Sequence, residues 1–390
     1  MKILVISPTP THPQNAGNRA RIFNLLHAIK DMGHEVFFMH VQTEQGDTGA
    51  MRRHWQDRFV SLPYQYPLAS QPLSHKLRRR FISMVTSHPN FHFIDDLYDT
   101  RIDHAIRTLH EKEHFDVVLV EYVFFSKALE NFGTDVIKII DTHDIFTDRY
   151  RIYEKAGMKP QWFSTAAKEE QKGLNRAAII LAIQEKDKHF FQTLCARQII
   201  TIGYLAPLMR SLRTRNDNKR ILFIGSDNPI NIEAVDYFLQ SVFPAIRSAV
   251  PETELCLAGK VANSFPHIPG CMPIGEFDAL DDAYSLSDIV INPARIGTGL
   301  SIKAIEAMGY SKALVSTRTG IRGIEDGEGN AFLVADSPEL FAQYVIRLLD
   351  DREFLRNLTE GAYTYARNWN DRNLKELMNL FYKNGEHHDS

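Results

Sequence analysis

The pattern that decides the fold lies in residues 2–40, KILVISPTPTHPQNAGNRARIFNLLHAIKDMGHEVFFMH. Its first apolar run, Lys2–Ser7, is typical of a buried strand, and a proline-rich loop follows it. The helix expected next carries its apolar residues on one stripe, formed by Ile22, Leu25, Leu26 and Ile29. Gly33 ends this helix, and residues 34–40 form a second apolar run. A strand, a helix and a strand in this order predict a βαβ unit and therefore a parallel sheet.

Further apolar runs of the same kind recur in both halves of the chain. In the first half we expect strands at residues 116–121, 136–140, 178–183 and 198–202. In the second half we expect strands at residues 220–225, 254–258, 288–292 and 313–317, with helices from about residue 232 and over residues 301–310. Strands that alternate with helices predict an α/β fold in each half.

The length of 390 residues exceeds what one hydrophobic core usually supports, so two domains are expected. Residues 204–218 are polar and basic without clear periodicity, and we place the domain boundary there. We predict an N-terminal Rossmann-like domain at 1–205, a C-terminal one at 206–368, and a helix at 369–390 that returns to the first domain. Because parallel sheets bind ligands beyond the carboxyl ends of their strands, two such domains facing each other would enclose a cleft.

The composition excludes several classes of protein. Formal net charge is −3, which argues against a dedicated partner of nucleic acid. The three cysteines (Cys195, Cys256 and Cys271) form no C-x-x-C pair, so neither a disulfide framework nor a zinc site is expected. No apolar stretch approaches the roughly 18 residues that span a bilayer. The sequence therefore predicts a soluble, cytoplasmic protein.

The segment richest in chemistry is residues 288–325, DIVINPARIGTGLSIKAIEAMGYSKALVSTRTGIRGIE. Gly297 and Gly299 would let the backbone approach a ligand closely, and N–H groups at the start of the next helix attract phosphate. Lys303 and Glu306 are three residues apart and share one helix face. A cation for phosphates and a carboxylate for ribose hydroxyls suit a nucleotide. The alternative is an ordinary solvated Lys–Glu pair after a glycine-containing loop.

The run P-x-R-x-G-x-G-x-x-x-K-x-x-E-A-M, residues 293–308, resembles the donor-site signature of retaining, family 4-like glycosyltransferases of the GT-B fold. Other parts of the chain resemble the same family in the same order. They are the loop Gly17-Asn18-Arg19, the G-H-E-V run at residues 33–36, the strand end Phe223–Ser226, and the region from Gly259 to Tyr284. The resemblance implies two Rossmann-like domains that face each other across a cleft.

The resemblance also implies roles for individual residues. Glu306 would bind the ribose of the donor, and Lys303 and Arg295 would hold its diphosphate together with backbone N–H groups. The residues expected to bind the donor in this way are Gly225, Ser226, Gly297, Thr298, Gly299, Leu300 and Ser301. The co-substrate would be a nucleotide-diphosphate sugar, with no separate cofactor, and the acceptor a glycan or a lipid-linked molecule of polysaccharide assembly. The leaving phosphate would take the acceptor proton, so no protein base is required.

Two positions depart from the family pattern. Many members carry a glutamate that touches the donor sugar eight residues before the ribose-binding one, where this chain has Thr298. Many also carry Arg and Lys after the first C-terminal strand, where this chain has Ser226-Asp227-Asn228. We therefore expect Arg295 and Lys303 to bind the donor diphosphate in their place.

The N-terminal half contains further candidates beyond expected strand ends. His143, followed by Asp144, comes after the run at 136–140, and the resemblance implies contact with the donor sugar. Glu185 ends another strand region, and Gly17 and Arg19 lie in the first loop. We expect these residues to line the acceptor side of the cleft. The alternatives are a histidine that caps a turn, helix capping by Glu185, and a plain turn glycine.

A basic segment, Lys76-Leu77-Arg78-Arg79-Arg80, has Phe81 and Met84 close by. It is either a solvated helix face or a site for anionic lipid headgroups or a lipid-diphosphate acceptor. The second interpretation predicts peripheral contact at the inner face of the membrane.

No D-x-D triplet occurs in the sequence, and the histidines lack zinc spacing, so we expect no metal site and metal-independent transfer.

Three rival functions remain. A nucleotide-sugar epimerase of the same architecture would use the same donor site without an acceptor. A non-catalytic sugar-nucleotide-binding protein would explain the missing glutamate at Thr298, although Lys303 and Glu306 argue against it. A dinucleotide-dependent dehydrogenase needs a fuller glycine fingerprint after the first strand, where this chain has only Gly17.

Overall fold

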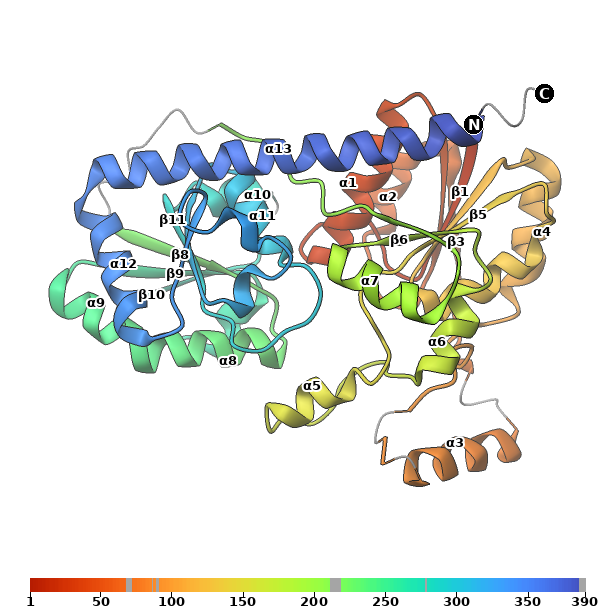
Figure 1. Cartoon of the computed structure of the whole chain (residues 1–390), viewed down its shortest axis with the longest axis horizontal. Coiled ribbons are helices and arrows are strands. Elements are labelled where there is room, and N and C mark those ends of the chain that lie inside the picture. The colour runs from red at the N-terminus through yellow and green to blue at the C-terminus, as the bar shows by residue number, and fades with distance from the viewer. Residues whose placement is uncertain (68–71, 86, 89–90, 211–218, 278, 386–390) are drawn as a thin grey trace. The chain divides into compact units, whose positions relative to one another are not determined.

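The computed structural model describes residues 1–390 except 68–71, 86, 89–90, 211–218, 278 and 386–390 (Figure 1). The chain forms two compact units. Unit 1 comprises Met1–Pro13, Arg21–Gly203 and Leu374–Ser390, and unit 2 comprises Gln14–Ala20 and Tyr204–Asn373. The sequence analysis had not assigned Gln14–Ala20 to the second unit. Residues 211–218 of the expected boundary segment lie outside the described residues.

Unit 1 contains a parallel sheet of seven strands in the order β3-β2-β1-β4-β5-β6-β7. The strands are β1 (Lys2–Ser7), β2 (Glu35–Val41), β3 (Phe59–Leu62), β4 (Val117–Glu121), β5 (Ile137–Asp141), β6 (Ile179–Ala182) and β7 (Gln198–Thr201). Successive residues of β1 pack into two different apolar clusters, Leu4 and Ile6 into one, Ile3 and Val5 into the other. Because side chains alternate along a strand, the sheet has an apolar core on each face.

The helices of unit 1 connect these parallel strands. They are α1 (Gly17–Asp31, whose first turn counts with unit 2), α2 (Thr48–Trp55), α3 (Leu73–Val85), α4 (Ile102–Glu113), α5 (Tyr150–Lys155), α6 (Ala167–Leu174) and α7 (Glu185–Leu194). In register, Glu121 at the end of β4 pairs with Asp141 at the end of β5. Two carboxylates therefore meet at the carboxyl edge of the sheet.

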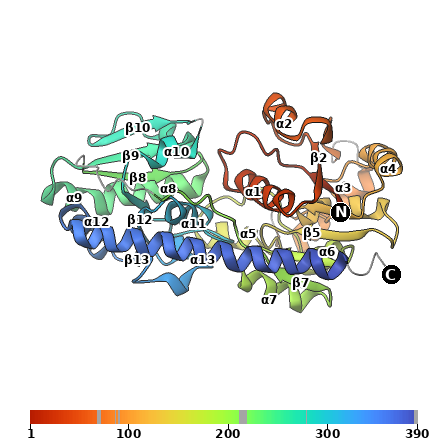
Figure 2. The same cartoon turned by 90° about the horizontal axis from the view of Figure 1, so that it is seen from above.

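Unit 2 contains a parallel sheet of six strands, which follow one another from β10 to β13 in Figure 2. In the order β10-β9-β8-β11-β12-β13 they are Cys271–Gly275, Glu254–Ala258, Arg220–Ile224, Ile289–Asn292, Ala313–Ser316 and Phe332–Val334. The helices are α8 (Pro229–Tyr237), α9 (Phe243–Ala249), α10 (Leu280–Tyr284), α11 (Ile302–Gly309), α12 (Pro338–Asp350) and α13 (Arg352–Gly385).

The predicted fold class is confirmed, because both halves of the chain form parallel α/β sheets. Three strands were not predicted, and each has a weak signal. Strand β10 contains Pro273, β13 has three residues, and the four-residue β3 follows directly on a helical turn. All three are at or next to a sheet edge, where few residues need to be apolar.

The last helix is longer than expected, since α13 begins at Arg352 rather than near Asp371. Gly361 lies inside it and would ordinarily weaken a helix. A Cβ at this position would overlap the carbonyl oxygen of Asn330, so the glycine permits close packing of α13. Within unit 2 the helix also holds the segment after β7. The indole of Trp369 donates to the carbonyl of Tyr204 (2.8 Å). The side chain of Asn370 accepts from the N–H of Ala206 (3.0 Å) and donates to its carbonyl (2.8 Å).

The end of α13 completes a core cluster of unit 1 through Leu377, Leu380 and Phe381. We predict that Leu377→Ala lowers the free energy of unfolding by about 2–5 kcal/mol, because it removes a fully buried side chain and leaves a cavity. The neighbouring exposed residue gives the control, Met378→Ala, with an expected change within about 0.5 kcal/mol. Urea unfolding of the whole chain measures both. Equal midpoints for the two variants would contradict this packing.

Candidate functional site

A cavity of about 400 Å³ lies in unit 2, beyond the carboxyl ends of its strands. Its walls include Gly225 and Ser226 after β8, Asn292 at the end of β11, and Glu276 and Phe277 after β10. The segment at residues 14–20 also contributes. This is the edge at which open parallel sheets bind ligands.

The loop between β11 and α11 is held in place from two sides. The Asn292 side chain donates to the Ser301 hydroxyl (3.1 Å) and to the carbonyl of Gly320 (2.7 Å). The Arg322 guanidinium donates to the carbonyl of Gly297. Gly299 has φ of +64°, a conformation that favours glycine, and α11 begins at Ile302. The loop is therefore held in a fixed position where it leads into the start of α11.

Lys303 brings a partly buried cation to this cavity. Its ammonium donates to the Asn231 side-chain oxygen (2.8 Å) and lies 4.5 Å from the centre of the Phe223 ring. Burial lowers the pKa of Lys303 to about 8, so the side chain stays mostly protonated at neutral pH. Within the described part of the chain, no carboxylate forms an ion pair with it. An anionic group in the cavity would therefore meet a cation that has little competing charge.

Glu306 brings a buried carboxylate to the same cavity. Its Oε1 accepts from the Tyr204 hydroxyl (2.8 Å) and its Oε2 from the Tyr284 hydroxyl (3.1 Å). The Tyr284 ring in turn stacks on Tyr310, with 4.4 Å between ring centres. Burial raises the pKa of Glu306 from its ordinary value. Each carboxylate oxygen has a second lone pair, so the fixed group can still accept bonds from a ligand.

The strand ends of β8 and β9 approach each other closely beside the cavity. Gly259 has φ of +86°, and a Cβ there would overlap the carbonyl oxygen of Gly225. Asn231 braces the same region, since its amide donates to the carbonyl of Ser226 (2.9 Å) while its oxygen accepts from Lys303. Asn228 caps α8 by accepting from the N–H of Asn231 (2.9 Å). A second helix start thus lies at this wall.

Most predicted donor residues line the one cavity. They are Gly225, Ser226, Gly297, Thr298, Leu300, Ser301, Lys303 and Glu306, and Gly17, which was predicted for the acceptor side, lines it too. Gly299 and Arg19 do not line it, and Arg19 donates to the side chain of Asn15 (3.4 Å).

Arg295 lies outside the cavity walls. Its guanidinium pairs with Glu233 (2.9 Å from Nε) and lies over the Tyr237 ring at 4.2 Å. The contact of Arg295 with a diphosphate stays a prediction.

Two contributors to the cavity were not singled out from the sequence. Arg322 follows the T-G pair inside the segment 288–325, and its place after strand β12 was the available signal. Tyr204 begins the segment after β7, in a region that looked like a featureless linker. No local pattern connects Tyr204 to Glu306, which lies 102 residues further along the chain.

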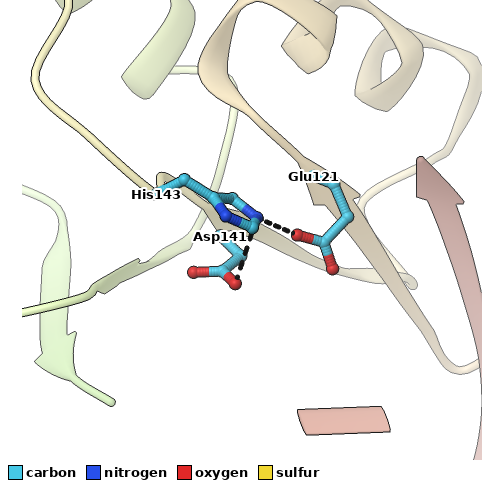
Figure 3. A group of neighbouring side chains, drawn as sticks. All are labelled: Glu121, Asp141 and His143. Carbon is cyan, nitrogen blue, oxygen red and sulfur yellow. Dashed lines mark hydrogen bonds and ion pairs between the residues drawn. The ribbon is translucent and has the colours of Figure 1, made fainter. Parts of the chain in front are cut away.

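Unit 1 contains a second group of buried charges, Glu121, Asp141 and His143 (Figure 3). His143 Nε2 lies 2.6 Å from Glu121 Oε2 and 3.5 Å from Asp141 Oδ2. Arg21, also buried, donates to both oxygens of Asp141 (3.0 and 2.7 Å). Burial, together with the charge of Asp141, raises the pKa of Glu121 to about 7. The short contact thus joins the imidazole of His143 to a carboxyl group whose pKa lies near neutral pH.

The backbone around this group is strained at two residues. His143 has φ of +61° and Tyr122 has φ of +70°, a region that side chains other than glycine rarely enter. The Tyr122 ring stacks on the imidazole, with 4.2 Å between ring centres. Strain of this kind is typical of functional sites.

The three residues Glu121, Asp141 and His143 could each offer one ligand atom to a metal ion, within 4.8 Å of one another. Arg21, however, already occupies both oxygens of Asp141, and its positive charge opposes a second cation. The predicted metal independence remains untested.

The other predicted residues of unit 1 make ordinary polar contacts. Asp144 pairs with Arg149 (3.0 Å), and the exposed Glu185 at the start of α7 pairs with Lys188 (3.4 Å). Their roles on an acceptor side stay predictions.

Comparison with known proteins gives a family for part of the chain and a fold for all of it. Residues 218–351 match the model of the family Glycosyl transferases group 1. An uncharacterized 44.6 kDa protein in the cps region of Klebsiella pneumoniae is 23% identical over 420 residues, covering 98% of this chain and all of that protein.

Solved structures agree over almost the whole chain. The sucrose-phosphate synthase of Thermosynechococcus elongatus superposes with a TM-score of 0.69 at 13% identity, covering 98% of each chain. The pneumococcal O-GlcNAc transferase GtfA, solved with UDP and GlcNAc, gives 0.65 at 10% identity, covering 98% of this chain and 99% of that one. The chain therefore has the GT-B fold of glycosyltransferases, and its residues 218–351 carry the sequence of the glycosyl transferases group 1 family.

Proposed function

We propose that this protein is a retaining glycosyltransferase, which moves a sugar from a nucleotide-diphosphate sugar to a glycan or lipid-linked acceptor. One observation carries the proposal. A partly buried ammonium, Lys303, and a buried carboxylate, Glu306, share one face of α11 and line one cavity at the carboxyl edge of a parallel sheet. They lie in the segment that matches the group 1 family.

The donor diphosphate would bind where positive charge gathers. Lys303 supplies an ammonium, and the starts of α8 and α11 add the positive ends of two helix dipoles. Arg322, which lines the cavity while it braces Gly297, adds a guanidinium, and Arg295 would join if its side chain leaves Glu233. Negative charge builds on the diphosphate as the glycosidic bond breaks, so cations fixed before the reaction stabilise the transition state.

The donor ribose would bind to Glu306. Tyr204 and Tyr284 fix the carboxylate by one hydrogen bond to each oxygen, which leaves it oriented before a ligand arrives. A fixed acceptor binds hydroxyl groups with little loss of entropy. UDP is the first nucleotide to test, since GtfA was solved with UDP.

We further propose that the transfer retains the anomeric configuration of the sugar and needs no metal ion. This proposal is supported by the resemblance of residues 293–308 to the donor signature and by the lack of a D-x-D triplet. His143 would contact the donor sugar, with Glu121 holding its ring by the 2.6 Å contact. Thr298, in place of the usual glutamate, lines the cavity. It would form a hydrogen bond to the donor sugar through its hydroxyl group, where the glutamate would use a carboxylate.

We expect Glu306→Gln to weaken UDP binding by about tenfold or more, because an ionised acceptor of ribose bonds, worth about 1.5–3 kcal/mol, is lost. Glutamine keeps the size of the side chain, and a circular dichroism melt checks that the variant folds. Glu339→Gln, on the exposed first turn of α12, is the matched control. Calorimetry with and without EDTA gives the affinities. Equal affinity of Glu306→Gln and wild type would remove Glu306 from the donor site.

We expect the affinity for UDP to fall as the pH rises from about 7.5 to 9.5, since Lys303 has a pKa of about 8 and loses its charge in this range. The second ionisation of a phosphate, near pH 6, is then already complete. Binding of the anion favours the protonated lysine, which fixes the sign.

Two variants separate Lys303 from other causes of this pH dependence. Lys303→Arg keeps a charge at every pH and should lose the fall in affinity, whereas Lys303→Met should bind weakly throughout. Arg318→Ala, an exposed cation of the same unit, is the control. The same steep fall in Lys303→Met would assign the titration to another group.

A product assay with a UDP-sugar separates transfer from epimerisation, which yields a changed nucleotide sugar without a glycan product.

A further inference from the structure

Helix α3 (Leu73–Val85) of unit 1 exposes a stripe of large apolar side chains. The stripe consists of Leu73, Leu77, Phe81, Met84 and Val85, with exposed fractions from 56% (Leu77) to 71% (Leu73 and Met84). Their spacing of three and four residues places them on one face of the helix. No residue of α3 is fully buried, and Figure 1 shows the helix at the periphery of unit 1, away from the sheet.

The opposite face of α3 makes the polar contacts with the rest of unit 1. His75 Nε2 lies 2.6 Å from Asp96 Oδ1, and Arg79 lies 4.0 Å from the same carboxylate. The Ser83 hydroxyl donates to the carbonyl of His88 (2.8 Å). A surface helix normally buries its apolar face and exposes its polar face. Helix α3 has the reverse arrangement, so its apolar stripe is available to an apolar environment outside the chain.

Positive charge borders the stripe. Arg78 and Arg80 are exposed, Lys76 is partly exposed, and the helix contains no acidic residue. Arg78 lies 5.2 Å from the centre of the Phe93 ring, which holds the guanidinium beside the stripe. The whole chain has a formal net charge of −3, so this positive charge is local. An apolar helix face bordered by arginines complements an anionic lipid surface, in which negatively charged headgroups lie above an apolar interior.

We propose that α3 docks on an anionic lipid bilayer, lying in the plane of its surface. The stripe would enter the boundary between headgroups and acyl chains, and Arg78 and Arg80 would contact lipid phosphates. Among the described residues, no helix is both long and apolar enough to cross a membrane. A helix of 13 residues is about 20 Å long, which suits an interfacial position. The inference goes beyond the proposed transfer reaction and does not rest on it.

A second copy of this chain fits the helix less well. In a symmetric dimer the same patch would meet itself, so Arg78 and Arg80 of one copy would approach those of the other. Like charges at an interface oppose association. A leaflet of anionic lipid covers the apolar stripe and compensates the arginines together.

The experiment is flotation of the full chain with vesicles of phosphatidylglycerol and phosphatidylcholine in about equal amounts, or of phosphatidylcholine alone. We expect binding to the anionic vesicles only, weakened between about 0.05 and 0.5 M salt as screening grows. Leu77→Gln with Phe81→Gln should reduce binding by about tenfold or more, since glutamine keeps the helix but removes apolar area. Arg78→Gln with Arg80→Gln should reduce it by about tenfold or more too.

The matched control is Tyr382→Gln, which removes an equally exposed aromatic side chain from α13 and should leave binding unchanged. UDP affinity in solution should stay the same in all these variants, so failure of docking and failure of the donor site are distinguishable. Wild type that stays with the soluble fraction at low salt would overturn the proposal, as would undiminished binding of the Leu77 and Phe81 variant. A concentration-dependent dimer that this variant abolishes, without vesicle binding, would identify a second copy as the occupant and also overturn it.

Discussion

The ammonium of Lys303, partly withdrawn from water, and the buried carboxylate of Glu306 set the conditions that unit 2 has to meet. A buried charge is destabilising by several kcal/mol unless hydrogen bonds or opposite charges compensate it. Asn231 on α8 compensates the lysine, and Tyr204 and Tyr284 compensate the glutamate. These partners come from separate segments of the chain. The cavity therefore takes its shape only when α8, α10, α11 and the segment after β7 are packed together.

The same rule governs the carboxyl edge of the sheet in unit 1. Register places Glu121 beside Asp141, and two adjacent carboxylates repel each other in a buried environment. Arg21 neutralises one of them, and His143 lies within hydrogen-bond distance of the other. The positive φ of His143 is the conformation in which its ring reaches Glu121 while stacking on Tyr122. Both sheets thus concentrate charge at the edge where parallel strands end.

The fold could be predicted because its central strands are buried on both faces and appear as unbroken apolar runs. Strand β10 contains a proline, and the apolar run at β13 is too short to identify as a strand from the sequence. The loop that lines the candidate site could be predicted because Gly297, Lys303 and Glu306 lie within ten residues of one another. The roles of Tyr204 and Arg322 could not be predicted, since they depend on contacts with Glu306 and Gly297 that form only when the chain folds. The basic segment at residues 76–80 was visible in the sequence. Its orientation was not, because helical spacing shows which residues share a face but not which face the protein covers.

Helix α13 has a consequence for how the chain is made. Leu377, Leu380 and Phe381 belong to the same core cluster as Ile3 and Val5 of the first strand, although they are synthesised long after it. During translation, domains usually fold as units from the N-terminus onward. Here the first sheet emerges from the ribosome with one apolar face incompletely covered, and it stays so until the other sheet and the last helix have followed. Unit 1 is therefore the first to begin folding and the last to be finished.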